Sequence, residues 1–284
     1  MGEFPLCPAA ARVAAEAACG AQVELKEITN RRGAAVWKAT GLDGAVAVKA
    51  GGGEGAAVTR REAAVLESIG WPDHLLASGE DDGLSWLVTR WFTGPSTWQV
   101  FTPVRRGAGG RRRALTSSVD LCRAVAELHA SGWVHSDIQP SHGIHTDHGV
   151  RLIDCSWSWR EGTEPAGDFR GGITHLVAPE LAASINAGIQ PVTPSTAAEV
   201  YALAGTLWTC ITGRWPLDYA AAGIDPHRLT PAELRAHLAT GRIPLDTAAP
   251  WPKFQDVLRP VLLAEPAERP AAAELAQALA EVAT

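Results

Sequence analysis

The stretch that decides the fold covers residues 135–142 and reads HSDIQPSH. We expect the segment after it to form a hairpin that turns at residues 146–149, TDHG, and ends at Asp154. Because a hairpin returns the chain to where it began, Asp137 and Asp154, seventeen residues apart, should meet at one end of it. One carboxylate could then accept or orient a hydroxyl proton while the other holds Mg²⁺. The stretch therefore predicts a transfer site built on two aspartates.

A lysine and a glutamate earlier in the chain complement these carboxylates. Lys49 ends an apolar stretch typical of a buried strand, and Glu62 follows thirteen residues later, beside the apolar side of an expected helix. A lone lysine at a strand end is usually a solvated charge, so Lys49 is informative only with a partner. Glu62 could orient the ammonium group toward phosphate oxygens, and phosphoryl transfer depends on such charge placement more than on covalent chemistry.

The surrounding pattern divides the chain into a strand-rich part and a helical part. The expected elements of the first part are strands at 23–28, 35–39, 45–49, 75–79 and 84–89, helices at 8–19 and 59–69, and a Gly-rich linker at 51–55. Those of the second part are helices at 197–212, 231–239, 254–264 and 270–282, and a further helix after a capping box at 117–120. This succession predicts an α+β fold with two unlike lobes.

Composition limits the partners. The 284 residues include 25 Lys and Arg against 31 Asp and Glu, and the net charge of −6 argues against nucleic acid as the main partner. The five cysteines lack Cys-x-x-Cys spacing, so we expect neither a disulfide framework nor a cysteine zinc site. No apolar run approaches the roughly 20 residues of a membrane span, and the N-terminus lacks the pattern of a secretion signal. We expect a cytoplasmic protein without a membrane partner.

From about residue 22 onward the chain resembles the eukaryotic-like Ser/Thr protein kinases of bacteria, because these motifs follow one another as in that family. The resemblance implies a bilobal protein-kinase-like fold: an N-lobe (22–92) with a five-stranded antiparallel sheet and one helix, and a mainly helical C-lobe (93–284). A helical extension (1–21) precedes them.

The resemblance also implies roles for single residues. Lys49 and Glu62 would hold ATP, Asp137 would be the catalytic base of a motif that begins at His135, and Asp154 would bind Mg²⁺.

Further positions match the family outside these motifs. Backbone groups of Arg90 and Phe92 would bind the adenine edge of ATP, behind the small side chain of Thr89. Residues 178–180 reproduce an Ala-Pro-Glu motif, and the resemblance implies a structural ion pair between Glu180 and Arg269.

Several positions depart from the family pattern. Only Gly33 lies near the position of the glycine-rich phosphate loop; Arg31 or Arg32 could supply charge instead, or the segment could be an ordinary hairpin turn. Ser136 replaces a regulatory arginine, which favours constitutive or partner-controlled activity. Gln139 replaces the lysine that steadies the transferred phosphoryl group, and it can donate hydrogen bonds but no charge.

His142 occupies the position of a metal-binding asparagine. Because Mg²⁺ prefers oxygen ligands, His142 could hold Asp137 in place, bind a softer metal such as Mn²⁺, or mark weak activity. The nearby histidines lack zinc spacing, and we expect His145 and His148 on or near a solvated turn.

Two more features have competing interpretations. Five arginines between residues 105 and 113 form either a solvated surface or a docking site for an acidic peptide. Trp157 and Trp159 could line a peptide groove, although packing is the favoured explanation.

Three hypotheses follow. The first is a kinase that uses ATP and Mg²⁺ (or Mn²⁺) on Ser or Thr hydroxyls of a peptide or protein; its narrower form acts on a precursor peptide in lanthipeptide-like biosynthesis with a partner lyase. The second is a pseudokinase scaffold that binds a partner protein without phosphoryl transfer. The third, a small-molecule kinase of the aminoglycoside type, is disfavoured by the Ala-Pro-Glu motif and by Arg269.

Overall fold

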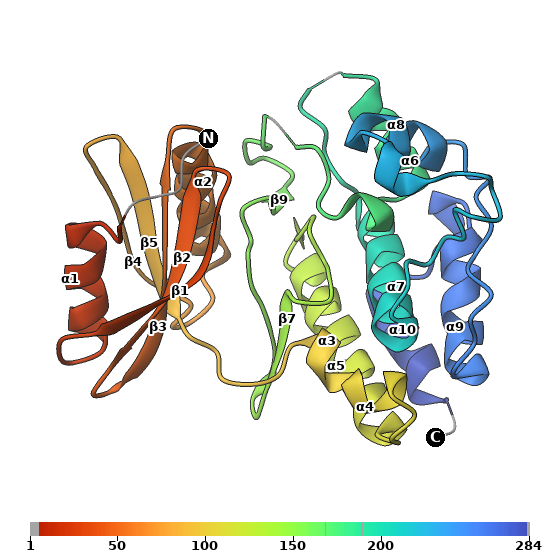
Figure 1. Cartoon of the computed structure of the whole chain (residues 1–284), viewed down its shortest axis with the longest axis horizontal. Helices are drawn as coiled ribbons and strands as arrows, with labels where there is room; N and C mark the ends of the chain where they lie inside the picture. Colours follow the sequence, from red (N-terminus) through yellow and green to blue (C-terminus); the bar gives the residue numbers. More distant parts are fainter. Residues whose placement is uncertain (1–5, 168, 189, 283–284) are drawn as a thin grey trace. The chain divides into compact units, whose positions relative to one another are not determined.

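The structure is a computed structural model that describes residues 6–167, 169–188 and 190–282. The chain divides into two compact units, the first ending at Phe92 and the second beginning at Thr93. Figure 1 shows that the first is built around a sheet and the second mainly from helices. Residues 1–5 of the expected extension lie outside the described residues.

The first unit is an antiparallel sheet with a helix on each face (Figure 1). Its described elements are α1 (Ala9–Ala18), β1 (Glu24–Arg31), β2 (Ala34–Gly41), β3 (Gly44–Gly52), α2 (Glu54–Ile69), β4 (Leu75–Asp81) and β5 (Leu84–Arg90). The strand order is β1-β2-β3-β5-β4, which confirms the predicted five-stranded sheet. Side chains alternate between the two faces, so Val46 and Val48 pack against Ala11 and Ala15 of α1 while Lys49 points to the other face.

The glycines between β3 and α2 do not form the expected linker. Strand β3 continues to Gly52, and α2 begins at Glu54, five residues before the predicted start. These glycines let the helix lie close to the strand and to the β1–β2 turn: a Cβ on Gly51 would be 2.2 Å from the carbonyl oxygen of Gly55, and one on Gly55 would be 2.3 Å from that of Gly33. The prediction of a Gly-rich linker was wrong because these glycines serve close packing.

The second unit is organised around one buried helix. Its described helices are α3 (Thr97–Val100), α4 (Thr102–Arg105), α5 (Arg111–Ala130), α6 (Pro179–Asn186), α7 (Thr196–Thr212), α8 (Pro231–Leu238), α9 (Pro252–Leu263) and α10 (Ala272–Ala280). Its described strands are β6 (Trp133–Val134), β7 (Gly143–Thr146), β8 (Gly149–Leu152) and β9 (Trp159–Arg160). Helix α7 is apolar on all sides and buried, as expected of a helix in the core, and it packs against α5 and α9.

One helix start in this unit was predicted wrongly. Helix α5 begins at Arg111, so the supposed capping box at 117–120 lies inside it. The hydroxyl of Ser118 donates to the carbonyl oxygen of Ala114, a bond within the helix, because this residue faces the core. A capping box does occur at Ser96, where α3 begins. The pairing of β6 with β9 was not predicted, since two-residue strands leave no periodic pattern.

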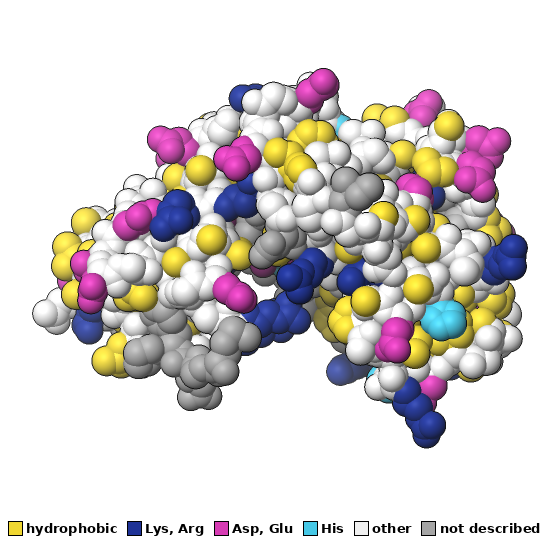
Figure 2. Space-filling model, turned by 90° about the horizontal axis from the view of Figure 1, so that it is seen from above, with side chains coloured by type: hydrophobic (Ala, Val, Ile, Leu, Met, Phe, Trp, Pro, Cys, Tyr) yellow, Lys and Arg dark blue, Asp and Glu magenta, His cyan; other side chains and the backbone are white. Residues whose placement is uncertain are grey.

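The surface carries charges of both signs. Acidic and basic side chains are both scattered over the face shown in Figure 2, with apolar side chains among them. Among the residues that the structure describes, none of the helices has both the length and the apolar character that a membrane crossing requires.

Candidate functional site

A buried carboxylate holds the loop that carries Asp137. Glu199, near the start of α7, is 3% exposed and accepts hydrogen bonds from the backbone nitrogens of His135 (3.1 Å) and Ser136 (2.6 Å). The same carboxylate is 2.7 Å from Nε2 of His129, at the end of α5. Ser136 has a φ of 70°, a region that residues other than glycine rarely adopt. Glu199 therefore fixes a strained backbone directly before Asp137.

His135 links this loop to the segment that carries Asp154. Its ring is completely buried, and Nδ1 accepts a hydrogen bond from the backbone nitrogen of Asp137 at 3.3 Å. The ring proton is thus on Nε2, which donates to the carbonyl oxygen of Ile153 at 3.1 Å. Burial lowers the pKa of His135 below its usual value, which favours this neutral form. His135 lies in the core, as expected, and orients both aspartate segments.

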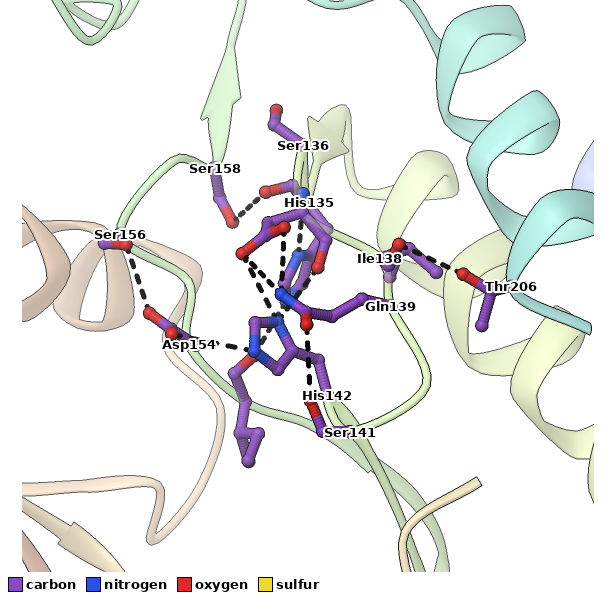
Figure 3. Close-up of polar contacts among 12 residues, drawn as sticks. His135, Ser136, Ile138, Gln139, Ser141, His142, Asp154, Ser156, Ser158 and Thr206 are labelled. Carbon is purple, nitrogen blue, oxygen red and sulfur yellow. Dashed lines mark hydrogen bonds and ion pairs between the residues drawn. The ribbon is translucent and has the colours of Figure 1, made fainter. Parts of the chain in front are cut away.

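Asp137, His142 and Asp154 come together at the end of the β7–β8 hairpin, and one ligand atom from each lies within 4.8 Å of the others. Figure 3 shows His142 pointing toward Asp154. Nδ1 of His142 donates to the carbonyl oxygen of Asp137 at 2.9 Å, and Nε2 is 3.7 Å from Oδ2 of Asp154. Asp154 has a φ of 61° and accepts a hydrogen bond from Ser156 at 3.1 Å. Two carboxylates and an imidazole are a donor set that fits a divalent cation, with Mn²⁺ better suited to the nitrogen than Mg²⁺.

The carboxylate of Asp137 is enclosed. Nε2 of Gln139 donates to both of its oxygens, each at 3.1 Å, and only 9% of the Asp137 side chain is exposed. Gly172 covers it from another side, because a Cβ added there would lie 1.7 Å from Oδ1. Gln139, which can donate hydrogen bonds but no charge, directs its amide to this aspartate. The contact of Gly172 was missed, and the sequence carries no signal for it beyond a pair of adjacent glycines.

In the first unit, Lys49 and Glu62 meet. The Nζ of Lys49 is 2.5 Å from Oε2 of Glu62, and 16% and 6% of the two side chains are exposed. Val36 lies opposite Lys49 across β2 and β3, and Thr89 lies opposite Ala47 across β3 and β5. Cross-strand partners share a face, so this face presents small and β-branched side chains beside a fixed ammonium group. A flat base and a phosphate group fit such a surface.

The residues expected around adenine and phosphate differ from the expectation in detail. The backbone nitrogen of Arg90 donates to the carbonyl oxygen of His74 at 3.0 Å, so an adenine contact through Arg90 would have to use its carbonyl. Phe92 packs edge-to-face on the ring of His74. Arg32 and Gly33 both have positive φ and form the two-residue turn between β1 and β2.

Glu180 and Arg269 form a two-point ion pair in the second unit. Nη1 and Nη2 of Arg269 lie 2.5 and 2.9 Å from the two carboxylate oxygens of Glu180. The Arg269 side chain is 2% exposed, and its guanidinium stacks over Tyr201 at 5.1 Å. The pair joins the start of α6 to the segment before α10, a structural role.

Arg105, His145 and Trp157 are all partly buried. Arg105 donates to the carbonyl oxygens of Cys210 and Trp98, so it does not belong to a free basic surface. His145 lies beside the hairpin turn, as expected, but its ring is partly buried: Thr97 Oγ1 is 2.9 Å from its Nε2, and burial lowers its pKa to about 4. Trp157 packs edge-to-face against Phe169, in agreement with the packing interpretation.

Comparisons with known proteins support a kinase relationship. The chain is 27% identical over 242 residues to Serine/threonine-protein kinase pkn2 of Myxococcus xanthus. The alignment covers 78% of this chain and 26% of that protein, so the chain spans about a quarter of the length of this relative. No protein-family model matches the chain. The chain is thus a divergent relative of a Ser/Thr kinase.

Proposed function

We propose that the chain is a phosphotransferase that uses ATP and a divalent cation to phosphorylate Ser or Thr hydroxyls of a peptide or protein. The observation that carries this proposal is the convergence of Asp137, His142 and Asp154 within 4.8 Å. The kinase relative and the Lys49–Glu62 pair support it. When bound, ATP supplies the phosphoryl group and the cation offsets the negative charge that builds up during transfer.

Each residue has a part that follows from its contacts. Asp137 would accept the hydrogen bond of the acceptor hydroxyl and take up its proton. The amide of Gln139 keeps both carboxylate oxygens of Asp137 in one orientation. Asp154 is the more accessible carboxylate, with 41% of its side chain exposed, and would hold the cation together with Nε2 of His142. Glu62 orients the ammonium of Lys49, which would bind phosphate oxygens.

A direct test compares phosphate transfer and nucleotide binding. The protein is incubated with labelled ATP, Mg²⁺ or Mn²⁺, and Ser/Thr peptides, beside Asp137→Asn and Lys49→Ala. We expect Asp137→Asn to bind nucleotide but to transfer at least about a hundredfold more slowly. Asp147→Asn, at an exposed aspartate in the hairpin turn, is the matched control and should transfer normally. Equal transfer by the wild type and by Asp137→Asn would refute the assignment.

The enclosure of Asp137 favours one alternative. A carboxylate with 9% exposure, covered by Gly172 and Gln139, would suit a pseudokinase scaffold that binds a partner protein without transfer. Nucleotide binding without transfer under either metal would select this alternative over the enzyme.

A narrower form of the enzyme proposal concerns the substrate. A precursor peptide in lanthipeptide-like biosynthesis, processed after phosphorylation by a partner lyase, fits the absence of a regulatory arginine at Ser136. It predicts that a lyase and a Ser/Thr-rich precursor peptide are encoded beside this chain, and unrelated neighbouring genes would count against it.

A further inference from the structure

An aromatic groove in the second unit begins at the catalytic loop. The cavity has a volume of about 500 Å³, and Gln139, Pro140 and Ser141 form one side of it. The side-chain amide of Gln139 donates to the Asp137 carboxylate, so one residue that lines the groove is in direct contact with that carboxylate. If the acceptor hydroxyl lies at Asp137, as the proposed function requires, this groove is within reach of the neighbouring residues of the acceptor peptide.

Two tryptophans held in fixed orientations line the groove. Trp98 is 38% exposed, and the guanidinium of Arg105 stacks over its ring at 3.5 Å. Trp215 stacks on His175 with the ring centres 4.4 Å apart, and Nδ1 of His175 is 2.9 Å from the hydroxyl of Tyr219. Rings that are already fixed lose little conformational entropy when a ligand binds. The tryptophans are therefore preorganised for an apolar side chain.

The charge of the groove limits what it can bind. Among its described lining residues, the polar ones include Gln99, Ser141 and Thr209, and Arg214 is the one that carries a charge. Nη1 of Arg214 is 3.3 Å from Asp246, and 68% of the arginine side chain is exposed. A basic side chain in the groove would lose water without gaining a carboxylate partner from the described lining, which is unfavourable.

We propose that this groove selects an acceptor peptide with an uncharged aromatic or large aliphatic residue beside its Ser or Thr, and that it rejects a basic residue there. The inference rests on the proposed function and names its substrate class. Its determinants are the rings of Trp98 and Trp215 and the absence of a carboxylate from the described lining.

The test uses peptide pools with one fixed Ser or Thr and one fixed neighbour, which is Phe, Leu, Ala, Arg or Asp, on either side of the acceptor. We expect kcat/KM for the best Phe or Leu pool to exceed that of Ala by about tenfold or more, and Arg to fall below Ala. Equal rates for Phe, Ala and Arg would overturn the proposal, as would a preference for Asp, which would indicate electrostatic docking on Arg214 instead.

Two variants separate the determinants. Trp98→Ala should lower the ratio of kcat/KM for the Phe pool to kcat/KM for the Ala pool about tenfold. Gln99→Glu retains the capping box, because a carboxylate oxygen can still accept from the backbone nitrogen of Ser96. It places a negative charge in the groove and should raise the rate for the Arg pool. Leu42→Ala, at an exposed apolar residue in the first unit, is the control. It should change neither the Phe-to-Ala ratio nor the Arg-to-Ala ratio of kcat/KM.

Failure of the groove and failure of the enzyme proposal give different results. If the wild type transfers phosphate to none of the pools, the proposed function fails, and the groove is tested by fluorescence anisotropy with a labelled Phe-containing peptide. Weaker binding to Trp98→Ala than to the wild type would still support the groove, and equal binding would refute it. If Trp98→Ala does not fold, the Gln99→Glu variant alone decides through the Arg pool.

Discussion

Substituting Glu199 by glutamine should disturb both the stability of the second unit and the position of Asp137. The Glu199 carboxylate accepts from three donors, at 2.6, 2.7 and 3.1 Å, within a site where it is 3% exposed. A glutamine offers one accepting oxygen and an NH₂ group, so at least one buried donor loses its partner. That loss costs about 1–3 kcal/mol, and about 2 kcal/mol corresponds to a fall in Tm of about 4–8 °C for a domain of this size.

The effect on activity follows from the backbone. Without two accepting oxygens, the positive φ of Ser136 is no longer enforced, and Asp137 shifts with it. A displacement of about 1 Å at a catalytic group can cost about a hundredfold in rate. We expect Glu199→Gln to lower kcat about a hundredfold and to leave the affinity for nucleotide unchanged.

Differential scanning calorimetry and peptide phosphorylation measure the two effects. Glu161→Gln makes the same chemical change at an exposed site and should leave both quantities unchanged. If the Tm of Glu199→Gln lies within about 1 °C of the wild-type Tm, the three hydrogen bonds to this buried carboxylate do not stabilise the loop, and the reasoning is wrong. An unchanged kcat with a lowered Tm would limit the role of Glu199 to stability.

The remaining predictions concern the Glu180–Arg269 ion pair, Gly172 beside Asp137, and the partly buried His145. Arg269→Met should lower the free energy of unfolding by about 3 kcal/mol in urea titrations, the low end for a buried pair because its partner is partly exposed. Gly172→Ala places a Cβ 1.7 Å from Asp137 and should reduce kcat about a hundredfold, whereas Gly167→Ala, with nothing within 4 Å, should not. The pKa of His145 is lowered to about 4 from an ordinary 6.5, so below about pH 6.5 the unfolded chain binds a proton that the folded chain does not. Stability measured by urea unfolding should therefore fall from pH 6.5 to 4, and less steeply in His145→Gln.

Elements with a regular apolar pattern could be predicted from the sequence. Strands β2 and β3 alternate between buried and half-exposed residues, and α7 is a long run of mostly apolar residues, so these elements were found near their true bounds. The start of α5 was missed because its first turn is a run of arginines without an apolar pattern. The start of α2 was missed because its glycines serve contacts with β3 that arise only after folding.

The candidate site, too, could be predicted only in part from the sequence. Lys49 and Glu62, and Asp137 and Asp154, carry chemistry that the sequence displays, and the structure brings the members of each pair near one another. The enclosure of Asp137 could not be predicted, because Gly172 lies thirty-five residues later in the chain. Spacing along the sequence gives no information about such a contact.

Three residues around Asp137, at positions 139, 142 and 172, act together to hold this aspartate. Gln139 donates to both oxygens of the carboxylate, His142 donates to the carbonyl of the same residue, and Gly172 permits the backbone to lie against it. Each of these contacts holds the aspartate without adding the charge that a lysine at position 139 would bring. In the proposed reaction, more of the charge compensation then falls to the cation held by Asp154 and His142. The site should therefore depend more steeply on the divalent cation than one with a lysine at that position, and Gln139→Lys should reduce that dependence.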